Sequence, residues 1–271
     1  MRVLSENHGE LDGLPIFWRS APHDGEVVPV YLHGVPTSSA DWTAFLERSG
    51  GLAPDLPGFG RSGKTGSRAY DMAEFDAFIE RFLDELGARR ISLLVHDWGA
   101  VGLLFAQRCP ERIARLVIVN AVPLMGGYRW HRTARMWRTP GLGELVMGAT
   151  NRYTLRFGSR ESNATPGPMP DEWIKGVMDH FDQGTQRAIL RLYRSSPPDA
   201  LAAAGAELAT LNVPALVAWG LRDPYFPPEF AKRYAELLPA AELLELSDAG
   251  HWPWLDKGDL VERVAAFMSE G

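Results

Sequence analysis

Five short runs of apolar and β-branched residues, separated by helical patterns, constrain the fold more than any other feature of this chain. The runs lie at 28–33, 91–96, 114–120, 214–220 and 241–247. Runs such as LLVH and LVIV are apolar almost without interruption, which is typical of strands covered on both faces,. Because strands that alternate with helices pair in parallel, the sequence predicts an α/β fold with a mostly parallel central sheet flanked by helices.

The intervening segments predict the helices that cover this sheet. Residues 71–86 have apolar side chains at helical spacing, so that one face is apolar and the other polar,. We expect further helices at 99–108, 228–238 and 259–268, and the alanine-rich segment 199–208 also favours a helix,.

The alternation stops after Asn120 and resumes near residue 211. Between these points there is no strand-like run, and Gly- and Pro-rich breaks separate helical pieces,. We therefore expect residues 1–122 and 211–271 to form a core and residues 123–210 to form a helical cap, inserted after the sixth core strand. A chain of 271 residues, 45% of them hydrophobic, is long enough to bury such a core as one domain,.

Charge and cysteine content exclude several classes of protein. A net charge of −6 with interspersed signs argues against a nucleic acid partner,. The single cysteine, Cys109, has no partner for an intrachain disulfide and no metal-ligand spacing around it,. We find no signal-like start and no apolar run long enough to span a membrane, so we expect a cytoplasmic protein that does not bind membranes.

Residues 93–100, LLVHDWGA, place a carboxylate where a buried strand runs into a polar turn. With the helix starting near Gly99, Asp97 would lie at the strand-to-helix turn known as the nucleophile elbow,. That elbow favours a small residue two places on either side; Gly99 fits and Val95 does not. An aspartate at such a position also commonly caps a helix, so the interpretation depends on partners elsewhere in the chain.

Three other strand ends supply such partners. The turn HGVPTSS at 33–39 offers the backbone N–H of Val35, which with the N–H of Trp98 would form an oxyanion hole,. Asp223 follows one late strand in WGLRDPYFP, and His251 follows the last strand in SDAGHWPW. The order Asp97, Asp223, His251 is the nucleophile, acid and base order of one hydrolase fold.

Together these motifs resemble the α/β-hydrolase superfamily, in the branch with an Asp nucleophile that includes epoxide hydrolases and haloalkane dehalogenases. The resemblance extends over residues 28–268. It implies a hydrolase that needs no metal and no organic cofactor, because water is the only co-substrate. A catalytically silent ligand-binding member of the fold is a further alternative, against which the intact set Asp97, Asp223 and His251 argues.

An Asp nucleophile indicates the kind of substrate. A carboxylate that attacks an acyl group gives an anhydride, whereas attack on a saturated carbon gives a stable ester. Water would then open that ester, with His251 as general base and Asp223 orienting the imidazole. The N–H groups of Val35 and Trp98 would stabilise the oxyanion that forms on Asp97.

The leaving group distinguishes the two substrate classes. An epoxide leaves an alkoxide that needs a proton, which a tyrosine hydroxyl can supply. The cap contains Tyr128, Tyr153 and Tyr193; Tyr193, in a YR segment like that of epoxide-hydrolase caps, is the first candidate and Tyr153 the second. The sequence therefore favours hydrolysis of a small, largely apolar epoxide to a vicinal diol.

A haloalkane is the alternative substrate. A halide leaves as an anion and needs only hydrogen-bond donors, which in dehalogenases are the indole N–H after the nucleophile and either an Asn in the HGxP turn or a cap Trp. Here Trp98 is present, but Val35 occupies the position of that Asn and has no side-chain donor. The missing donor would have to come from Trp130, Trp137 or Trp173 in the cap.

Overall fold

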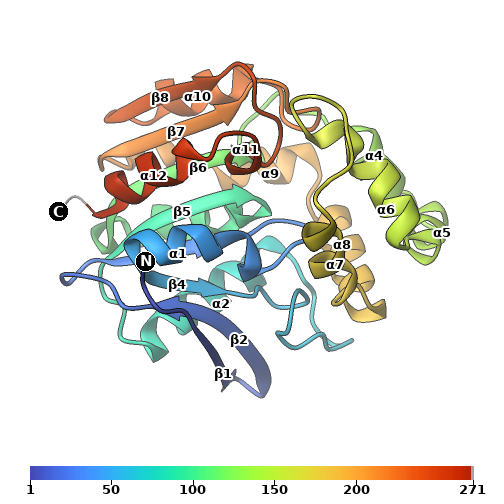
Figure 1. The fold of residues 1–271 in the computed structure, drawn as a ribbon, viewed down its shortest axis with the longest axis horizontal. Coiled ribbons are helices and arrows are strands. Elements are labelled where there is room, and N and C mark those ends of the chain that lie inside the picture. The colour runs from blue at the N-terminus through green and yellow to red at the C-terminus, as the bar shows by residue number, and fades with distance from the viewer. Residues whose placement is uncertain (270–271) are drawn as a thin grey trace.

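The computed structural model describes residues 1–269, which form an eight-stranded sheet in the order β1-β2-β4-β3-β5-β6-β7-β8 (Figure 1). Its strands are β1 (Ser5–Leu11), β2 (Leu14–Ala21), β3 (Val28–Leu32), β4 (Gly51–Pro54), β5 (Ile91–Asp97), β6 (Ile113–Ala121), β7 (Ala215–Gly220) and β8 (Ala241–Leu246). β2 pairs antiparallel with β1 and β4, and the remaining pairs are parallel. The prediction of a mostly parallel sheet is confirmed.

All five predicted strands are present, but three strands were missed. β1 and β2 form a hairpin whose turn residues Asp12 and Gly13 both have positive φ, as the tight Asp-Gly turn requires,. β1 is mostly exposed, so it lacks the apolar run that identified the inner strands. β4 has only four residues and therefore shows no periodicity.

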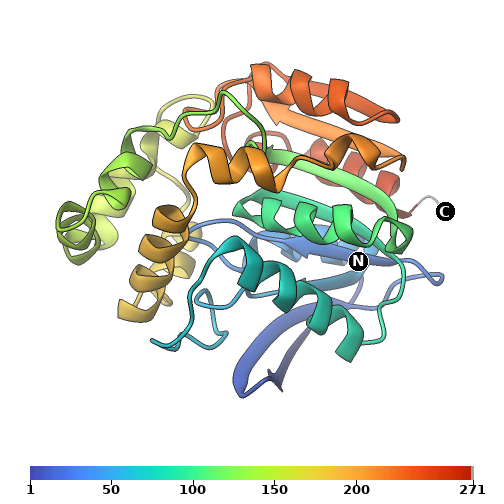
Figure 2. The same ribbon diagram turned by 180° about the vertical axis from the view of Figure 1, so that it is seen from behind.

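Two helical layers cover the sheet (Figures 1 and 2). One face carries α1 (Thr43–Ser49), α11 (Pro253–Asp256) and α12 (Asp259–Ser269); the other carries α2 (Met72–Glu85), α3 (Gly102–Arg108) and α10 (Glu229–Leu237). Each layer has its own apolar cluster: Leu94 packs in one and Leu93 in the other, because successive strand residues point to opposite faces,. Burial on both faces explains the uninterrupted apolar runs.

Only helices lie between β6 and β7 in the described part of the chain. They are α4 (Arg132–Arg138), α5 (Leu142–Ala149), α6 (Arg152–Gly158), α7 (Asp171–Met178), α8 (Gln183–Ser195) and α9 (Pro198–Ala204). Figure 1 shows α4 to α8 on one side of the sheet. We use the name cap for residues 123–210, as proposed from the sequence.

Short 3-10 helices complete the secondary structure: η1 (Ser39–Trp42), η2 (Trp98–Val101), η3 (Pro110–Arg112), η4 (Ser159–Ser162) and η5 (Leu208–Thr210). None of the helices within residues 1–269 combines the length and the apolar character needed to cross a bilayer.

Candidate active site

The turn after β5 holds Asp97 in a strained conformation. Its backbone has φ 49° and ψ −122°, a region that non-glycine residues rarely adopt,. Close backbone approach explains the neighbouring glycines: a Cβ on Gly99 would lie 2.2 Å from the Leu32 carbonyl oxygen, and one on Gly34 would lie 2.3 Å from the Asp97 Cβ. Val95 is completely buried in the apolar cluster beneath the turn, so this position accepts a large residue.

Two backbone N–H groups face the Asp97 carboxylate. The N–H of Val35 donates to Oδ1 at 2.7 Å, and the N–H of Trp98 also bonds the carboxylate. These are the two groups expected to form the oxyanion hole. One carboxylate oxygen therefore already lies in the hole, while Oδ2 lies 3.7 Å from His251 Nε2.

The imidazole of His251 lies between two carboxylates. Its Nδ1 lies 2.8 Å from Asp223 Oδ2, on the side opposite Asp97. The other Asp223 oxygen accepts the backbone N–H groups of Tyr225 and Phe226, at 2.7 and 3.2 Å. The structure thus brings together the three residues that the sequence pattern singled out, in a geometry that fits a nucleophile, base and acid.

Asn120 is a supporting residue that was not among the candidates from the sequence. Its Nδ2 donates to Asp223 Oδ2 at 2.8 Å, and its Oδ1 accepts the N–H of Gly220 at 2.8 Å. Asn120 is the penultimate residue of β6, and Gly220 ends β7, so this side chain joins the two strand ends. Its position at the end of a buried strand was the available signal.

Burial and charge set the protonation behaviour of this site. Burial raises the pKa of Asp97 to about 6, although the charge of His251 and the two backbone N–H groups lower it,. Burial alone would lower the pKa of His251, but Asp223 and Asp97 outweigh it and the pKa is raised. The ionised forms of the two side chains therefore stabilise each other,.

Tyr193 lies beside the nucleophile, on α8. Its side chain is 2% exposed, and its ring centroid is 5.2 Å from that of Trp98 and 4.9 Å from that of Trp130. Burial raises the pKa of Tyr193 well above its usual value and the charge of Asp97 raises it further, whereas the facing indole N–H of Trp98 lowers it. The phenol therefore stays protonated and can donate.

Tyr225 is a neighbour that the sequence analysis missed as a candidate. Its ring centroid lies 4.9 Å from that of His251, and its electrostatic interaction with Tyr193 raises the pKa of the Tyr193 phenol. The signal was its place two residues after Asp223. Tyr128, named among the cap tyrosines, also couples electrostatically to Tyr193.

The placement of Tyr153 in the site was wrong. Its side chain is 75% exposed, and its ring contacts the guanidinium of Arg152 rather than the nucleophile. The reason is the position of α6 on the outer part of the cap (Figure 1). Position within the cap sequence alone did not distinguish its inner from its outer helices.

The three cap tryptophans have different surroundings. Trp130 stacks on Trp98 but donates its N–H to the Ser196 carbonyl at 2.9 Å, so that group is already used. Trp137 packs edge-on against Tyr193, and Trp173 packs against Trp252. Within residues 1–269, the Trp98 N–H makes no hydrogen bond of normal geometry. It is the indole donor beside Asp97 that a leaving group can use.

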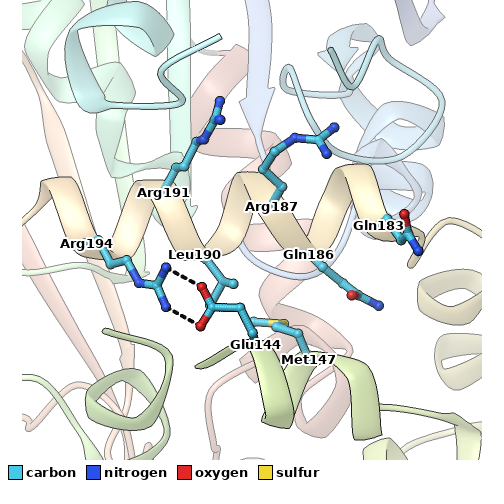
Figure 3. A pocket seen from close by; sticks show the side chains of 8 residues that line it. All are labelled: Glu144, Met147, Gln183, Gln186, Arg187, Leu190, Arg191 and Arg194. Carbon is cyan, nitrogen blue, oxygen red and sulfur yellow. Dashed lines mark hydrogen bonds and ion pairs between the residues drawn. The ribbon is translucent and has the colours of Figure 1, made fainter. Parts of the chain in front are cut away.

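The outer face of α8 forms a separate hollow with α5, of about 320 Å³ (Figure 3). There Arg194 binds the carboxylate of Glu144 with two hydrogen bonds, at 2.7 and 2.9 Å. This pair holds α8 against α5, and Tyr193, on the same helix, is not among the residues that line the hollow. The hollow is therefore distinct from the site around Asp97.

The loop that carries the base also contacts the cap. The N–H of His251 donates to the Ser162 carbonyl at 2.8 Å, and its carbonyl oxygen is 2.9 Å from His96 Nε2. His96 thus supports this loop, and His33 supports another, because its Nε2 accepts the N–H of Leu56. Among the described residues, we find no cluster of His, Cys, Asp and Glu suited to a metal ion.

The fold and this arrangement define an α/β hydrolase with an aspartate at the nucleophile position. A family model described as the alpha/beta hydrolase fold matches residues 30–258, and the chain belongs to that family, in the Asp-nucleophile branch with haloalkane dehalogenases and epoxide hydrolases.

Individual relatives place the chain more narrowly. It is 27% identical to a haloalkane dehalogenase of Bradyrhizobium diazoefficiens, over 94% of this chain and 90% of the relative. It is 29% identical to a cis-3-alkyl-4-alkyloxetan-2-one decarboxylase of Shewanella oneidensis, over 92% and 84%. The crystal structure of haloalkane dehalogenase DbeA from Bradyrhizobium elkani superposes with a TM-score of 0.85 at 26% identity, covering 98% of both chains.

Proposed function

We propose that this protein hydrolyses an electrophile with a reactive saturated carbon, through an ester on Asp97. The free Oδ2 of Asp97 attacks the carbon while Oδ1 remains in the oxyanion hole. His251 then deprotonates a water molecule that attacks the ester carbonyl, and Asp223 stabilises the imidazolium. The 2.8 Å contact between His251 and Asp223 and the 3.7 Å gap between His251 and Asp97 support this assignment.

The substrate that the site geometry favours is an epoxide, and the observation that carries this proposal is the buried phenol of Tyr193 beside Trp98. Opening the ring creates an alkoxide, and a protonated phenol close to the nucleophile can neutralise it as it forms. The product would be a vicinal diol. The aromatic rings of Trp98, Trp130 and Tyr128 around this phenol favour a small, largely apolar substrate,.

A haloalkane is the second candidate, and two observations favour it. The Trp98 N–H faces the Tyr193 hydroxyl but makes no hydrogen bond of normal geometry within the described chain, so the two groups would together donate to a halide. The relatives named haloalkane dehalogenase also support this candidate. Val35, which lacks a side-chain donor, argues against a halide site of the usual composition.

Trapping the ester would distinguish these candidates. In His251→Gln, ester formation should continue while its hydrolysis stops. We would expose this variant to styrene oxide and to 1-bromobutane in separate tubes and measure the intact protein mass. An increase equal to the whole epoxide supports the first candidate, and a butyl adduct without bromine supports the second. Neither adduct, or an adduct that persists in the His251→Gln, Asp97→Ala double variant, would contradict the proposed nucleophile.

The role of the phenol needs its own variant. Tyr193→Phe should slow epoxide opening by about 10²-fold or more, because the alkoxide loses its proton donor. Tyr153→Phe is the matched control, since this tyrosine is exposed on the outer cap and should leave the rate unchanged. Equal rates in Tyr193→Phe and the wild type would refute proton donation by Tyr193.

A further inference from the structure

With a haloalkane, the proposed mechanism leaves one proton to be removed from a closed site. Hydrolysis of the ester consumes water and yields the Asp97 carboxylate, an alcohol and one proton, which His251 takes first. His251 is only 2% exposed and is surrounded by aromatic rings, with centroids 4.4 to 5.3 Å away, of His96, Tyr225, Phe226 and Trp252. The imidazolium must lose this proton before it can act as a base again.

Asp41 has a position between this site and solvent. It lies in η1 and lines an open pocket of about 370 Å³ between α1 and α7, which we name the seam pocket. The seam pocket is lined by Thr37, Ser38, Ala40, Asp41, Thr43, Ala44, Glu47, Glu172, Trp173, Gly176, Val177, Trp254 and Leu255. One side of Asp41 therefore faces a space that solvent can enter.

The other side of Asp41 faces the triad. Its Oδ2 is buried and has no hydrogen bond of normal geometry within residues 1–269. The Thr37 hydroxyl and the Trp252 N–H face the carboxyl, and its charge interacts with those of His251 and Asp97. Trp252 is the residue next to His251, so the carboxyl lies close to the loop that carries the base.

The charges around Asp41 suit proton transfer. No Lys or Arg lines the seam pocket in the described residues; the other ionisable groups there are Glu47 on α1 and Glu172 on α7. Burial raises the pKa of Asp41 to about 7, although Thr37, Trp252 and His251 lower it. A carboxyl that titrates near neutral pH can both accept a proton from an imidazolium and release it to water.

We propose that Asp41 is the proton outlet of the active site, taking the proton of the His251 imidazolium through a bridging water and releasing it into the seam pocket. The transfer leaves neutral His251 and protonated Asp41, which then loses its proton to solvent. This role rests on the haloalkane candidate of the proposed function, whose turnover releases one proton together with the halide. An epoxide releases none, because the proton from ester hydrolysis restores the Tyr193 phenol that protonated the alkoxide.

A measurement without substrate tests the outlet directly. We would follow exchange of the His251 Nε2 proton with water by nitrogen-15 NMR, assigning the signal by its loss in His251→Gln. Asp41→Asn should slow this exchange by about tenfold or more, and added formate should restore it by replacing the missing carboxylate. The matched controls are Glu47→Gln and Glu172→Gln, which change the charge of the same pocket without facing His251.

Turnover provides the second readout. With a haloalkane such as 1-bromobutane, Asp41→Asn should lower kcat about tenfold and leave the rate of ester formation unchanged, and added formate should restore kcat. Unchanged proton exchange in Asp41→Asn, or equal slowing in Glu47→Gln, would overturn the outlet. A wild type that hydrolyses no electrophile but shows the expected exchange pattern would instead contradict the proposed function alone.

Discussion

Replacing the nucleophile with asparagine should make the protein more stable. The Asp97 carboxylate is 4% exposed, and burial raises its pKa from 3.8 to about 6. A pKa that is higher in the folded than in the unfolded state means that folding disfavours the ionised form. This difference corresponds to at most about 3 kcal/mol at neutral pH.

Asp97→Asn removes that charge and keeps the shape. The amide Oδ1 can still accept the Val35 N–H, and asparagine tolerates a positive φ as well as aspartate does,. The free energy of unfolding should therefore exceed that of the wild type above pH 6. The difference should shrink as the pH falls from 6 to 4, because the wild-type carboxyl becomes protonated in the folded state.

Urea unfolding at several pH values between 4 and 8 would measure this difference. Asp199→Asn, at an exposed position, is the control and should change stability by about 0.5 kcal/mol or less at every pH,. A stability gain in Asp97→Asn that does not depend on pH, or a loss at pH 8, would refute the argument from buried charge.

Four further outcomes are expected. Gly34→Ala should slow ester formation by about 10²-fold, measured by adduct mass in the His251→Gln background, because the new Cβ would lie 2.3 Å from Asp97 Cβ,. Asn120→Ala should lower the free energy of urea unfolding by about 1–3 kcal/mol, because the Gly220 N–H loses its acceptor,. The rate of ester formation should fall as the pH drops through about 6, and in His251→Gln its midpoint should move to higher pH, because the imidazole charge that lowers the pKa of Asp97 is gone. Arg194→Ala should cost only about 0.5 kcal/mol in urea unfolding, since its partner Glu144 is 55% exposed,.

The core of the fold was predictable because it depends on local patterns. Inner strands such as β5, β6 and β7 are buried on both faces and form apolar runs in the sequence. Asp97 ends β5 and Asp223 follows β7, whereas His251 follows β8, which is only partly buried. The hairpin β1–β2 escaped prediction because β1 is mostly exposed and lacks such a run. Its Asp12-Gly13 turn was a visible signal that the analysis did not use.

The cap was less predictable for a physical reason. Whether a cap side chain reaches Asp97 depends on the packing of helices against each other, which spacing along one helix does not reveal. Tyr193 and Tyr153 are both on cap helices with adjacent arginines, yet one is 2% and the other 75% exposed. Asn120, and Asp41 in the role proposed for it, were missed because they depend on contacts across distant segments.

The bond between the His251 N–H and the Ser162 carbonyl has a consequence for engineering. A Cβ on Gly250 would lie 2.1 Å from that same carbonyl oxygen, so the cap backbone and the loop of the base touch directly. The cap is therefore not an interchangeable module. A chimaera that carries the cap of another family member should keep the backbone path around Ser162. Otherwise the exchanged cap will displace the loop that carries His251.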